Sequence, residues 1–315
     1  MDSIAGITYP PHLTEVIILD DRSEDHTNEI AGQYCKKYSH FHSYTVSNDT
    51  TGLSGKMNVL NQGIHHASGE IILVTDADCE VSPGWADGLI SYFTAHTGMV
   101  GGITLLSKAK TDEPLFFKIQ ALDWLFLQGI ASGAAGSGFP TSILGNNFAF
   151  RKQAYRETGG FENIGFSLTE DMVLMQAIRR LKKWQIKYPL SSETEIFSQP
   201  AKSLNELLNQ RRRWVSGGII GPLSGWIMMI TAFLAHFLPL IFFLLAKPTL
   251  IIYVSLLMPI VSDLFFILRP LVRRIKKTDL LRYFTFFEIY YFFYTTIFTF
   301  LLLLPLKITW KSRRF

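Results

Sequence analysis

The chain has 315 residues, 48% hydrophobic and 14% aromatic, a content that is rich for a soluble domain and indicates that part of the chain lies in lipid. The formal net charge is only +4, and the basic residues gather beside apolar runs. They therefore predict anchors at a membrane face and argue against a nucleic-acid partner. Two cysteines, Cys35 and Cys79, make no disulfide framework, which favours a reducing compartment.

The apolar residues are unevenly distributed along the chain. Residues 1–214 mix charged, Gly-rich and apolar stretches as a globular domain does, whereas residues 215–315 are long apolar runs broken by short basic loops. We expect one domain over 1–214, long enough to bury its own core, and a membrane region over 215–315. Met1–Pro11 has neither the basic start nor the apolar stretch of a signal peptide.

Two short apolar runs predict buried strands that end in carboxylates. Glu15–Leu19 leads to Asp20 and Asp21, and Glu70–Thr75 leads to the sequence Asp76-Ala77-Asp78. Helical stretches alternate with these strands, which predicts a parallel sheet with helices on its faces and ligands beyond the carboxyl ends of the strands.

The other expected elements follow from apolar spacing and from capping residues. A Gly/Ala/Ser stretch from Gly129 to Gly138 is expected to end one helix. In chain order we expect helices over Glu24–Tyr38, Lys56–His66, Ser82–Thr94, Glu113–Leu127, Arg151–Thr158 and Glu170–Leu181, and further strands over Val100–Leu105 and Asn146–Phe150.

Three apolar runs near the C-terminus can each reach the roughly 20 residues that a bilayer helix requires: Val215–Ala246, Pro248–Leu268 and Tyr283–Leu306. With the first domain in the cytoplasm, three spans would place the basic tail outside, against the positive-inside tendency. If the first run begins as an interfacial helix, two spans return the tail to the cytoplasm. The sequence allows either.

The Asp76-Ala77-Asp78 sequence predicts a metal site. Two carboxylates on alternate positions can hold a hard divalent cation, Mg²⁺ or Mn²⁺, that also binds a diphosphate. Strand ends also collect aspartate for turn and capping reasons, so this motif has an ordinary explanation when it is taken alone.

Five motifs in a fixed order make the sequence resemble a family 2 glycosyltransferase with the GT-A fold, over about Ser3 to Trp214. The apolar tail also resembles that of cellulose, hyaluronan and ceramide-sugar synthases. The motifs are Val16-Ile-Ile-Leu-Asp-Asp21, Gly55-Lys56 with Asn58 and Asn61, Asp76-Ala-Asp78, Thr169-Glu-Asp171 and Gln210-Arg-Arg-Arg-Trp214. The resemblance implies an α/β, Rossmann-like nucleotide-sugar domain followed by a C-terminal region of two or three transmembrane helices.

By this resemblance, Asp20 and Asp21 contact the nucleoside, and Lys56 meets a phosphate at a helix start. Asp76 contacts the donor and shares the metal ion with Asp78. The alternatives stay open at each position: the first two aspartates can simply turn the chain into the next helix, and Lys56 can be a solvated surface lysine.

The same resemblance makes Asp171 the general base that removes the proton of the acceptor hydroxyl, with inversion at the anomeric carbon. Glu170 would position Asp171 or the acceptor. Because Thr169 is a good cap residue, compensation of the helix dipole is an alternative explanation for both acids.

The Gln210-Arg211-Arg212-Arg213-Trp214 motif precedes the first apolar run. The resemblance assigns Gln210, Arg211 and Arg213 to substrate binding, with Arg213 facing the diphosphate, and Trp214 to the acceptor. The positive-inside tendency predicts the arginines alone, but not the glutamine or the tryptophan. Asn147 is a further, looser candidate for the acceptor site.

Two acids lie within or beside the apolar runs, Asp263 and Glu288. An intramembrane carboxylate is by default a functional hypothesis, although both can sit at helix ends that face water.

Relatives begin with a strand that carries a Pro and Asn-Glu motif, and this sequence begins after it. A truncated start, a replacement segment or lost activity would each explain this difference.

The preferred function is inverting transfer from a nucleotide sugar, with a UDP-sugar favoured, to a lipid-linked or polysaccharide acceptor. We expect an integral protein of the inner or plasma membrane, with its catalytic domain in the cytoplasm. One rival is an inactive membrane-bound homologue that binds a donor or a partner. The second is a nucleotidyltransferase, against which the Gln-x-x-Arg-Trp motif argues.

Overall fold

The computed structural model describes residues 1–106, 113–219, 221–247, 249–301, 309–310 and 313–314. The chain divides by packing into two compact units. The first unit comprises residues 1–103, 143–189 and 193–196, and the second comprises residues 104–142, 190–192 and 197 onward. This division differs from the linear boundary expected at Trp214, because residues 104–142 and 197–214 pack with the C-terminal helices.

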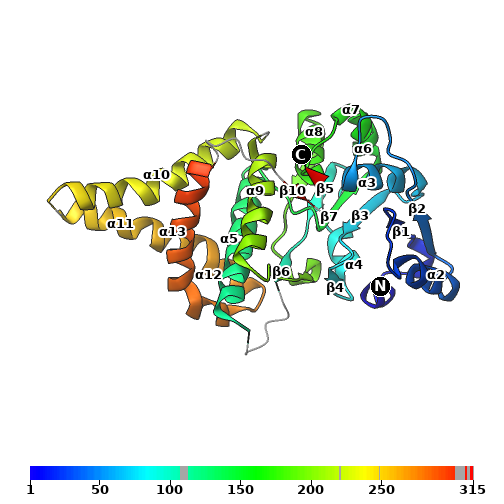
Figure 1. Ribbon diagram of the computed structural model, residues 1–315, viewed down its shortest axis with the longest axis horizontal. Coiled ribbons are helices and arrows are strands. Elements are labelled where there is room, and N and C mark those ends of the chain that lie inside the picture. Colours follow the sequence, from blue (N-terminus) through cyan, green and yellow to red (C-terminus); the bar gives the residue numbers. More distant parts are fainter. Residues whose placement is uncertain (107–112, 220, 248, 302–308, 311–312, 315) are drawn as a thin grey trace. The chain divides into compact units, whose positions relative to one another are not determined.

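The first unit begins with the alternation that the sequence predicts (Figure 1). Strand β1 (Val16–Asp20) pairs in parallel with β2 (Phe41–Thr45). The other elements are α1 (Asp2–Ala5), η1 (Pro11–Leu13), α2 (Thr27–Lys37), α3 (Gly55–His66), β3 (Ile71–Thr75), β4 (Glu80–Val81), α4 (Trp85–Ile90), β5 (Thr97–Gly101), β7 (Asn147–Arg151), α6 (Lys152–Glu157), α7 (Gly160–Ile164), α8 (Glu170–Arg180) and β8 (Gln185–Lys187), with η2 (Ser192–Thr194) and β9 (Ile196–Ser198) where the chain passes between the units.

The four-stranded sheet of the first unit has the order β3-β7-β5-β8 and is mixed, not parallel as expected. Strand β7 runs antiparallel to both β3 and β5, because the chain returns to this sheet after its excursion through residues 104–142. Thr75, the last residue of β3, pairs with Asn147, the first residue of β7. The register therefore brings the loop before β7 to the strand end that carries Asp76.

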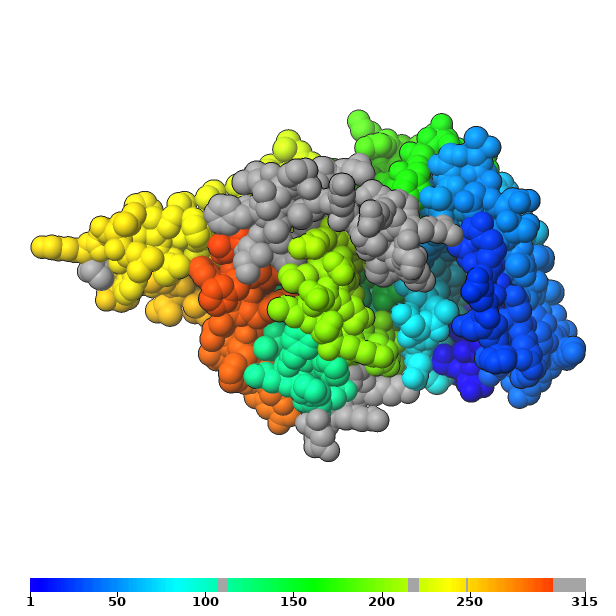
Figure 2. All heavy atoms as spheres, in the orientation of Figure 1, coloured from blue at the N-terminus to red at the C-terminus, as the bar shows by residue number. Residues whose placement is uncertain are grey.

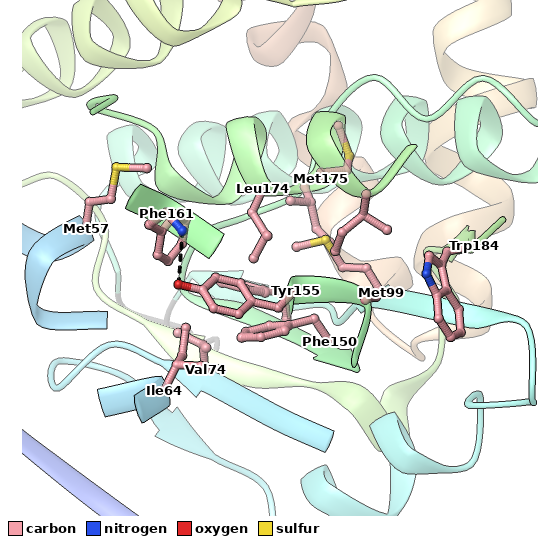
Figure 3. Close-up of a cluster of buried hydrophobic side chains, with 14 of the residues drawn as sticks. Met57, Ile64, Val74, Met99, Phe150, Tyr155, Phe161, Leu174, Met175 and Trp184 are labelled. Carbon is pink, nitrogen blue, oxygen red and sulfur yellow. Dashed lines mark hydrogen bonds between the residues drawn. The ribbon is translucent and has the colours of Figure 1, made fainter. Parts of the chain in front are cut away.

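The sheet buries both of its faces. On β7, Phe148 and Phe150 point into a cluster formed with α3, α6, α7 and α8, whereas Ala149 faces a second cluster with α4. In the first cluster the Tyr155 hydroxyl accepts a hydrogen bond of 3.0 Å from the Phe161 N–H (Figure 3). This core fixes the starts of α3 and α8, and both starts carry predicted site residues.

Two expected elements of this part of the chain differ in length. The helix expected over Ser82–Thr94 is limited to α4, which begins three residues later, after a turn in which the Trp85 N–H donates to the Ser82 carbonyl. The strand expected over Val100–Leu105 divides into β5 and β6 (Thr104–Leu106) at Gly102. A Cβ on Gly102 would stand 2.5 Å from the Asn147 side chain, so this position requires glycine.

The second unit is helical. Helix α5 runs over Leu115–Gly136, straight through the Gly/Ala/Ser stretch that we expected to end it. A Cβ on Gly129 would lie 2.8 Å from the Ile267 Cγ2 atom, so the small residue permits close packing between helices of this unit. The expectation was wrong because tertiary packing outweighs the low helix propensity of glycine.

Helices α10 (Leu223–Leu245) and α11 (Leu250–Ser262) lie side by side in the second unit, and in Figure 2 their yellow surfaces project from the rest of it. Many of their apolar side chains are exposed. The remaining elements are α9 (Leu204–Ile219), the π-helix η3 (Asp263–Leu268), α12 (Arg269–Arg274), η4 (Thr278–Tyr283), α13 (Phe284–Leu301), β10 (Thr309–Trp310) and β11 (Arg313–Arg314).

Two helical stretches among the described residues, Leu223–Leu245 and Leu250–Arg274, are long and apolar enough to cross a membrane. They correspond to the first two expected runs. The first run, Val215–Ala246, is divided, since α9 ends at Ile219 and α10 begins at Leu223. The third expected run is helical as α13, and its residues 302–306 lie outside the described residues.

Candidate active site

The site lies at strand ends of the first unit. The buried Asp20, last in β1, accepts hydrogen bonds from the Ser23 N–H at 3.3 Å and from the Asn28 side chain at 2.9 Å. These contacts are those of an acid that turns the chain into a helix. Its assignment to the nucleoside stays a prediction.

Asp21 lies at the surface of the same turn. Arg22, which has a left-handed backbone with φ of 60°, contacts Asp21 at 2.8 Å and Asp49 at 3.0 Å. The arginine therefore joins the loop after β1 to the loop after β2. Hydrogen bonding to Asp21 and the charges of both acids raise the pKa of the Arg22 guanidinium.

Helix α3 begins at Gly55, in a left-handed conformation with φ of 56°, and delivers Lys56 in its first turn. The two asparagines of this motif are buried and structural. The Asn58 Oδ1 atom accepts from the Thr50 N–H at 2.8 Å, and the Asn61 Oδ1 atom accepts from the Tyr155 hydroxyl at 2.8 Å. They fasten the helix, and so hold Lys56 in place.

The Lys56 ammonium joins three segments that are distant in sequence. Its Nζ atom lies 2.6 Å from Asp76 Oδ1 and 2.9 Å from Glu170 Oε1, and it donates to the Gly145 carbonyl oxygen at 2.8 Å. An ammonium has three N–H donors, so each donor has an acceptor in the protein. Lys56 thus links the end of β3, the start of α8 and the loop before β7.

Electrostatics keep Lys56 charged. Burial alone would lower its pKa, but the negative charges of Glu170 and Asp76 outweigh the loss of hydration and raise the pKa above the ordinary lysine value. The side chains of Lys56 and Asp76 are each 37% exposed, so solvent reaches this ion pair. The Glu170 side chain is only 6% exposed and is therefore buried beneath Lys56.

Gly145 brings the two acids of α8 to the same point. A Cβ at this residue would lie 2.8 Å from Asp171 Oδ2 and 3.1 Å from Glu170 Oε1. Both acids lie in the first turn of α8, and the Asp171 Oδ1 atom accepts from the Met172 N–H at 2.8 Å. The absence of a side chain on Gly145 therefore allows the loop to contact both carboxylates.

The acidic loop after β3 fits a divalent cation. Asp78 is exposed, and within the described part of the chain it has no ion-pair partner, whereas Asp76 uses one carboxylate oxygen for Lys56. Asp76 and Glu170 contact the Lys56 ammonium and Asp171 lies against Gly145, so carboxylates outnumber the ammonium in this group of described residues, and Asp78 follows two residues after Asp76. Hard carboxylate oxygens and an excess of negative charge suit Mg²⁺ or Mn²⁺.

Tyr188 is a residue that sequence analysis missed. It is buried close to Asp171, and burial together with the negative charge of Asp171 raises its pKa, so the phenol keeps its proton. A Cβ on Gly101 would lie 2.9 Å from its ring, which locates it beside β5. No sequence motif marks this tyrosine.

Asn147 makes structural contacts, and its assignment to the acceptor site stays a prediction. It is fully buried, its Oδ1 atom accepts from the Trp85 indole at 2.9 Å, and its Nδ2 atom donates to the carbonyls of Ile103 at 2.8 Å and Thr194 at 2.9 Å. Both amide N–H donors are therefore in use inside the unit.

The second unit contains the Gln210–Trp214 motif on α9. Arg211 is fully buried, donates to Asp123 of α5, and lies 4.2 Å above the Trp214 ring. The Tyr290 hydroxyl donates to the same carboxylate at 3.1 Å. A cation enclosed in this way has a structural role in the packing of this unit, and the expected substrate contact of Arg211 stays a prediction.

The other members of the motif are more accessible. Gln210, Arg213 and Trp214 are each partly buried, and the Trp214 ring packs edge to face with Trp124 at 5.2 Å between centroids. Their assignment to the substrate stays a prediction. Asp123, which neutralises Arg211, was not predicted, because a lone acid in an apolar helix carries no motif.

The Glycosyltransferase like family 2 model matches residues 1–217, more than half of the chain and all of the motifs above. The chain belongs to this family. A family 2 relative, the β-monoglucosyldiacylglycerol synthase of Trichormus variabilis, is 30% identical over 237 residues, covering 72% of this chain and 47% of that protein. Poly-β-1,6-N-acetyl-D-glucosamine synthase of Staphylococcus epidermidis is 26% identical over 219 residues, covering 69% of this chain and 50% of that protein.

This family 2 chain thus spans about half the length of the curated relatives it matches. Among solved structures, the mannosyltransferase PcManGT from Pyrobaculum calidifontis, in complex with GDP-Man and Mn²⁺, matches with a TM-score of 0.53 and 18% identity. The match covers 90% of this chain and 80% of that one. The likeness confirms the expected α/β glycosyltransferase fold of GT-A type.

Proposed function

We propose that the chain transfers a sugar from a nucleotide diphosphate, with a UDP-sugar as the favoured donor, to a lipid-linked or polysaccharide acceptor with inversion. The observation that carries the proposal is the convergence of Lys56, Asp76 and Glu170 around the Gly145 carbonyl, with Asp171 against the same glycine. This convergence supports a base and a cation site within one compact unit.

Asp78 and the second oxygen of Asp76 would hold Mg²⁺ or Mn²⁺. When bound, such an ion neutralises the charge of the departing diphosphate. Lys56 keeps one Asp76 oxygen engaged and fixes the orientation of that carboxylate. Asp20, at the end of β1, and Asp21, directly after it, would contact the nucleoside.

Asp171 would accept the proton of the acceptor hydroxyl as that oxygen attacks the anomeric carbon. A carboxylate held by the Met172 N–H on one oxygen presents its other oxygen in a fixed direction, which suits proton removal concerted with attack. Glu170 is a positioning residue, because its ion pair with Lys56 fixes the first turn of α8. A single displacement of this kind inverts the anomeric carbon.

The acceptor and the membrane setting have separate support. The two relatives above are named for synthesis of a glucosyl diacylglycerol and of a polysaccharide, so a lipid or saccharide acceptor is the natural expectation. The exposed apolar surfaces of α10 and α11 support insertion in the inner or plasma membrane, with the catalytic unit on the cytoplasmic side.

From the motif, Gln210 and Arg213 would contact the donor and Trp214 would stack on the acceptor.

Release of UDP from a panel of UDP-sugars by the detergent-solubilised full chain, with and without Mn²⁺, tests this function. Metal-dependent release that the variant Asp76→Ala/Asp78→Ala loses would support it and would identify the sugar. If folded protein releases no UDP with any donor in the presence of lipid and saccharide acceptors, the chain is a binding homologue without turnover.

A further inference from the structure

A second cluster of ionisable groups lies in the helical unit. His236 on α10, Asp263 at the start of the π-helix η3 and Glu288 on α13 each direct a ligand atom to one point, and these atoms all lie within 4.8 Å of one another. Three separate helices supply the three side chains. The glycosyltransferase chemistry described above uses none of them.

The cluster is enclosed. The side chains of His236 and Asp263 are each 9% exposed, and Glu288 is also 9% exposed. The Tyr291 ring covers the imidazole edge to face, at 5.4 Å between centroids. Ionisable groups withdrawn from water at this depth are costly unless they are paired or bind a cation.

The imidazole is oriented as a ligand. Its Nδ1 atom lies 2.8 Å from the carbonyl oxygen of Ala232, one helical turn earlier, and can only be the donor in that contact. The Nε2 atom of the neutral ring is therefore an acceptor, and it faces the two carboxylates. A backbone carbonyl that fixes one ring nitrogen while the other binds is the usual outer-shell arrangement of a metal-ligating histidine.

The facing atoms lack donors. His236 Nε2, Asp263 Oδ2 and Glu288 Oε1 are each buried without a hydrogen-bond partner among the described residues. The contact between His236 Nε2 and Asp263 Oδ2 is 3.5 Å, too long for a good hydrogen bond. Three converging acceptors need protons between them or a cation at their centre.

The charges favour a divalent cation over a proton. Two carboxylates and a neutral imidazole carry a charge of −2. A proton on His236 and a second proton on one carboxylate would also neutralise the cluster, but each proton can bridge only two of the three atoms, whereas one divalent ion would neutralise the cluster and contact all three. One imidazole with two carboxylates suits a first-row transition ion such as Zn²⁺ or Mn²⁺.

The backbone at Asp263 also departs from regular geometry. The helical stretch Leu250–Arg274 changes from α to π over Asp263–Leu268, and single π turns occur frequently at functional sites. We propose that His236, Asp263 and Glu288 form a second metal site, which binds a divalent transition-metal ion and fastens α10, η3 and α13 to one another. This proposal is independent of the catalytic one.

The metal content of the purified full chain tests the proposal. The parent carries Asp76→Asn and Asp78→Asn, so that the catalytic motif contributes no metal. After treatment with EDTA and dialysis against Zn²⁺, Mn²⁺ or Co²⁺, we expect one ion per chain, and visible d–d absorption with Co²⁺. His236→Ala and Glu288→Gln should weaken binding by more than the roughly 10- to 100-fold that loss of an outer-shell partner costs. Asp279→Asn, an exposed acid of the same unit, is the matched control and should bind as the parent does.

Absence of metal in the folded parent overturns the proposal, and so does equal uptake by the parent and both site variants. If the variants do not fold, X-ray absorption of the Zn²⁺-loaded parent decides. One nitrogen and carboxylate oxygens around the ion support the site, and sulfur or water ligands alone refute it.

Discussion

The Asp171 carboxylate lies directly against Gly145, where an added Cβ would stand only 2.8 Å from the Oδ2 atom. Gly145→Ala should therefore displace either the loop or the candidate base. A displacement of about 1 Å can reduce turnover about 100-fold, and crowding of the buried Asp171 carboxylate should also lower the stability. Sugar transfer and thermal unfolding measure the two effects. Gly32→Ala, in a helix with open space at the added methyl, is the control and should retain activity.

Replacement of Lys56 by glutamine should leave Asp76 and Glu170 without their shared cation. We expect kcat to fall on the order of 100-fold, since both carboxylates lose their orientation. Lys56→Arg should recover part of the rate. Equal rates for the wild type and Lys56→Gln would remove Lys56 from the site.

The raised pKa of Lys56 predicts a specific pH dependence. A group whose pKa is raised on folding contributes stability that is complete below the unfolded pKa of 10.5 and is lost as the pH rises through the folded pKa. The stability difference between wild type and Lys56→Gln should therefore be constant from pH 6 to pH 9. Chemical denaturation across that range measures it, and a difference that declines near neutral pH would contradict the ion pairs.

Variants of the proposed base and of the proposed metal ligand should differ in their effect on metal-dependent UDP binding. Asp171→Asn should reduce transfer by about 100- to 10,000-fold while metal-dependent UDP binding survives, because only proton removal is lost. Asp78→Ala should weaken that binding itself. Calorimetric titration with UDP and Mn²⁺ distinguishes the two, and turnover retained by the Asn variant would exclude Asp171 as the base.

The buried pair of Arg211 and Asp123 should be a stability determinant. Arg211→Met leaves Asp123 charged and buried without its cation, which typically costs about 3–5 kcal/mol. The double variant Arg211→Met/Asp123→Leu should recover most of the loss. Thermal unfolding in detergent measures both, and a single variant as stable as the wild type would restore the substrate role expected for Arg211.

The elements of the first unit follow from the local sequence more closely than those of the second. An apolar run that ends in aspartate marks β1 and β3 locally, so the positions of Asp20 and Asp76 were readable. The proximity of Lys56, Gly145 and Glu170 depends on the antiparallel insertion of β7, which no local pattern encodes. The predicted parallel sheet missed that insertion.

The contacts of the second unit that local sequence does not reveal have a common cause, which is their large separation along the chain. In the sequence, Arg211 has the pattern of a cation that flanks a membrane segment. Its burial depends on Asp123, which lies 88 residues earlier in the chain. It also depends on Tyr290, which contacts the same carboxylate and lies 167 residues after Asp123. Gly129 looked like a helix end until its contact with Ile267 was known. Asp263 and Glu288 were recognised as unusual, but their partner His236 lies in an apolar run without a motif.

The hydrogen bond between Tyr290 and Asp123 has a consequence for synthesis of the chain. Its two residues are separated by 167 positions, so at about 5–20 residues per second roughly ten to thirty seconds pass between their translation. Helix α5 emerges first, and its Asp123 carboxylate acquires the Arg211 cation and the Tyr290 hydroxyl only when α9 and α13 follow. During this interval the acid lacks the two partners that accompany its burial, so α5 can reach its final packing only late in synthesis.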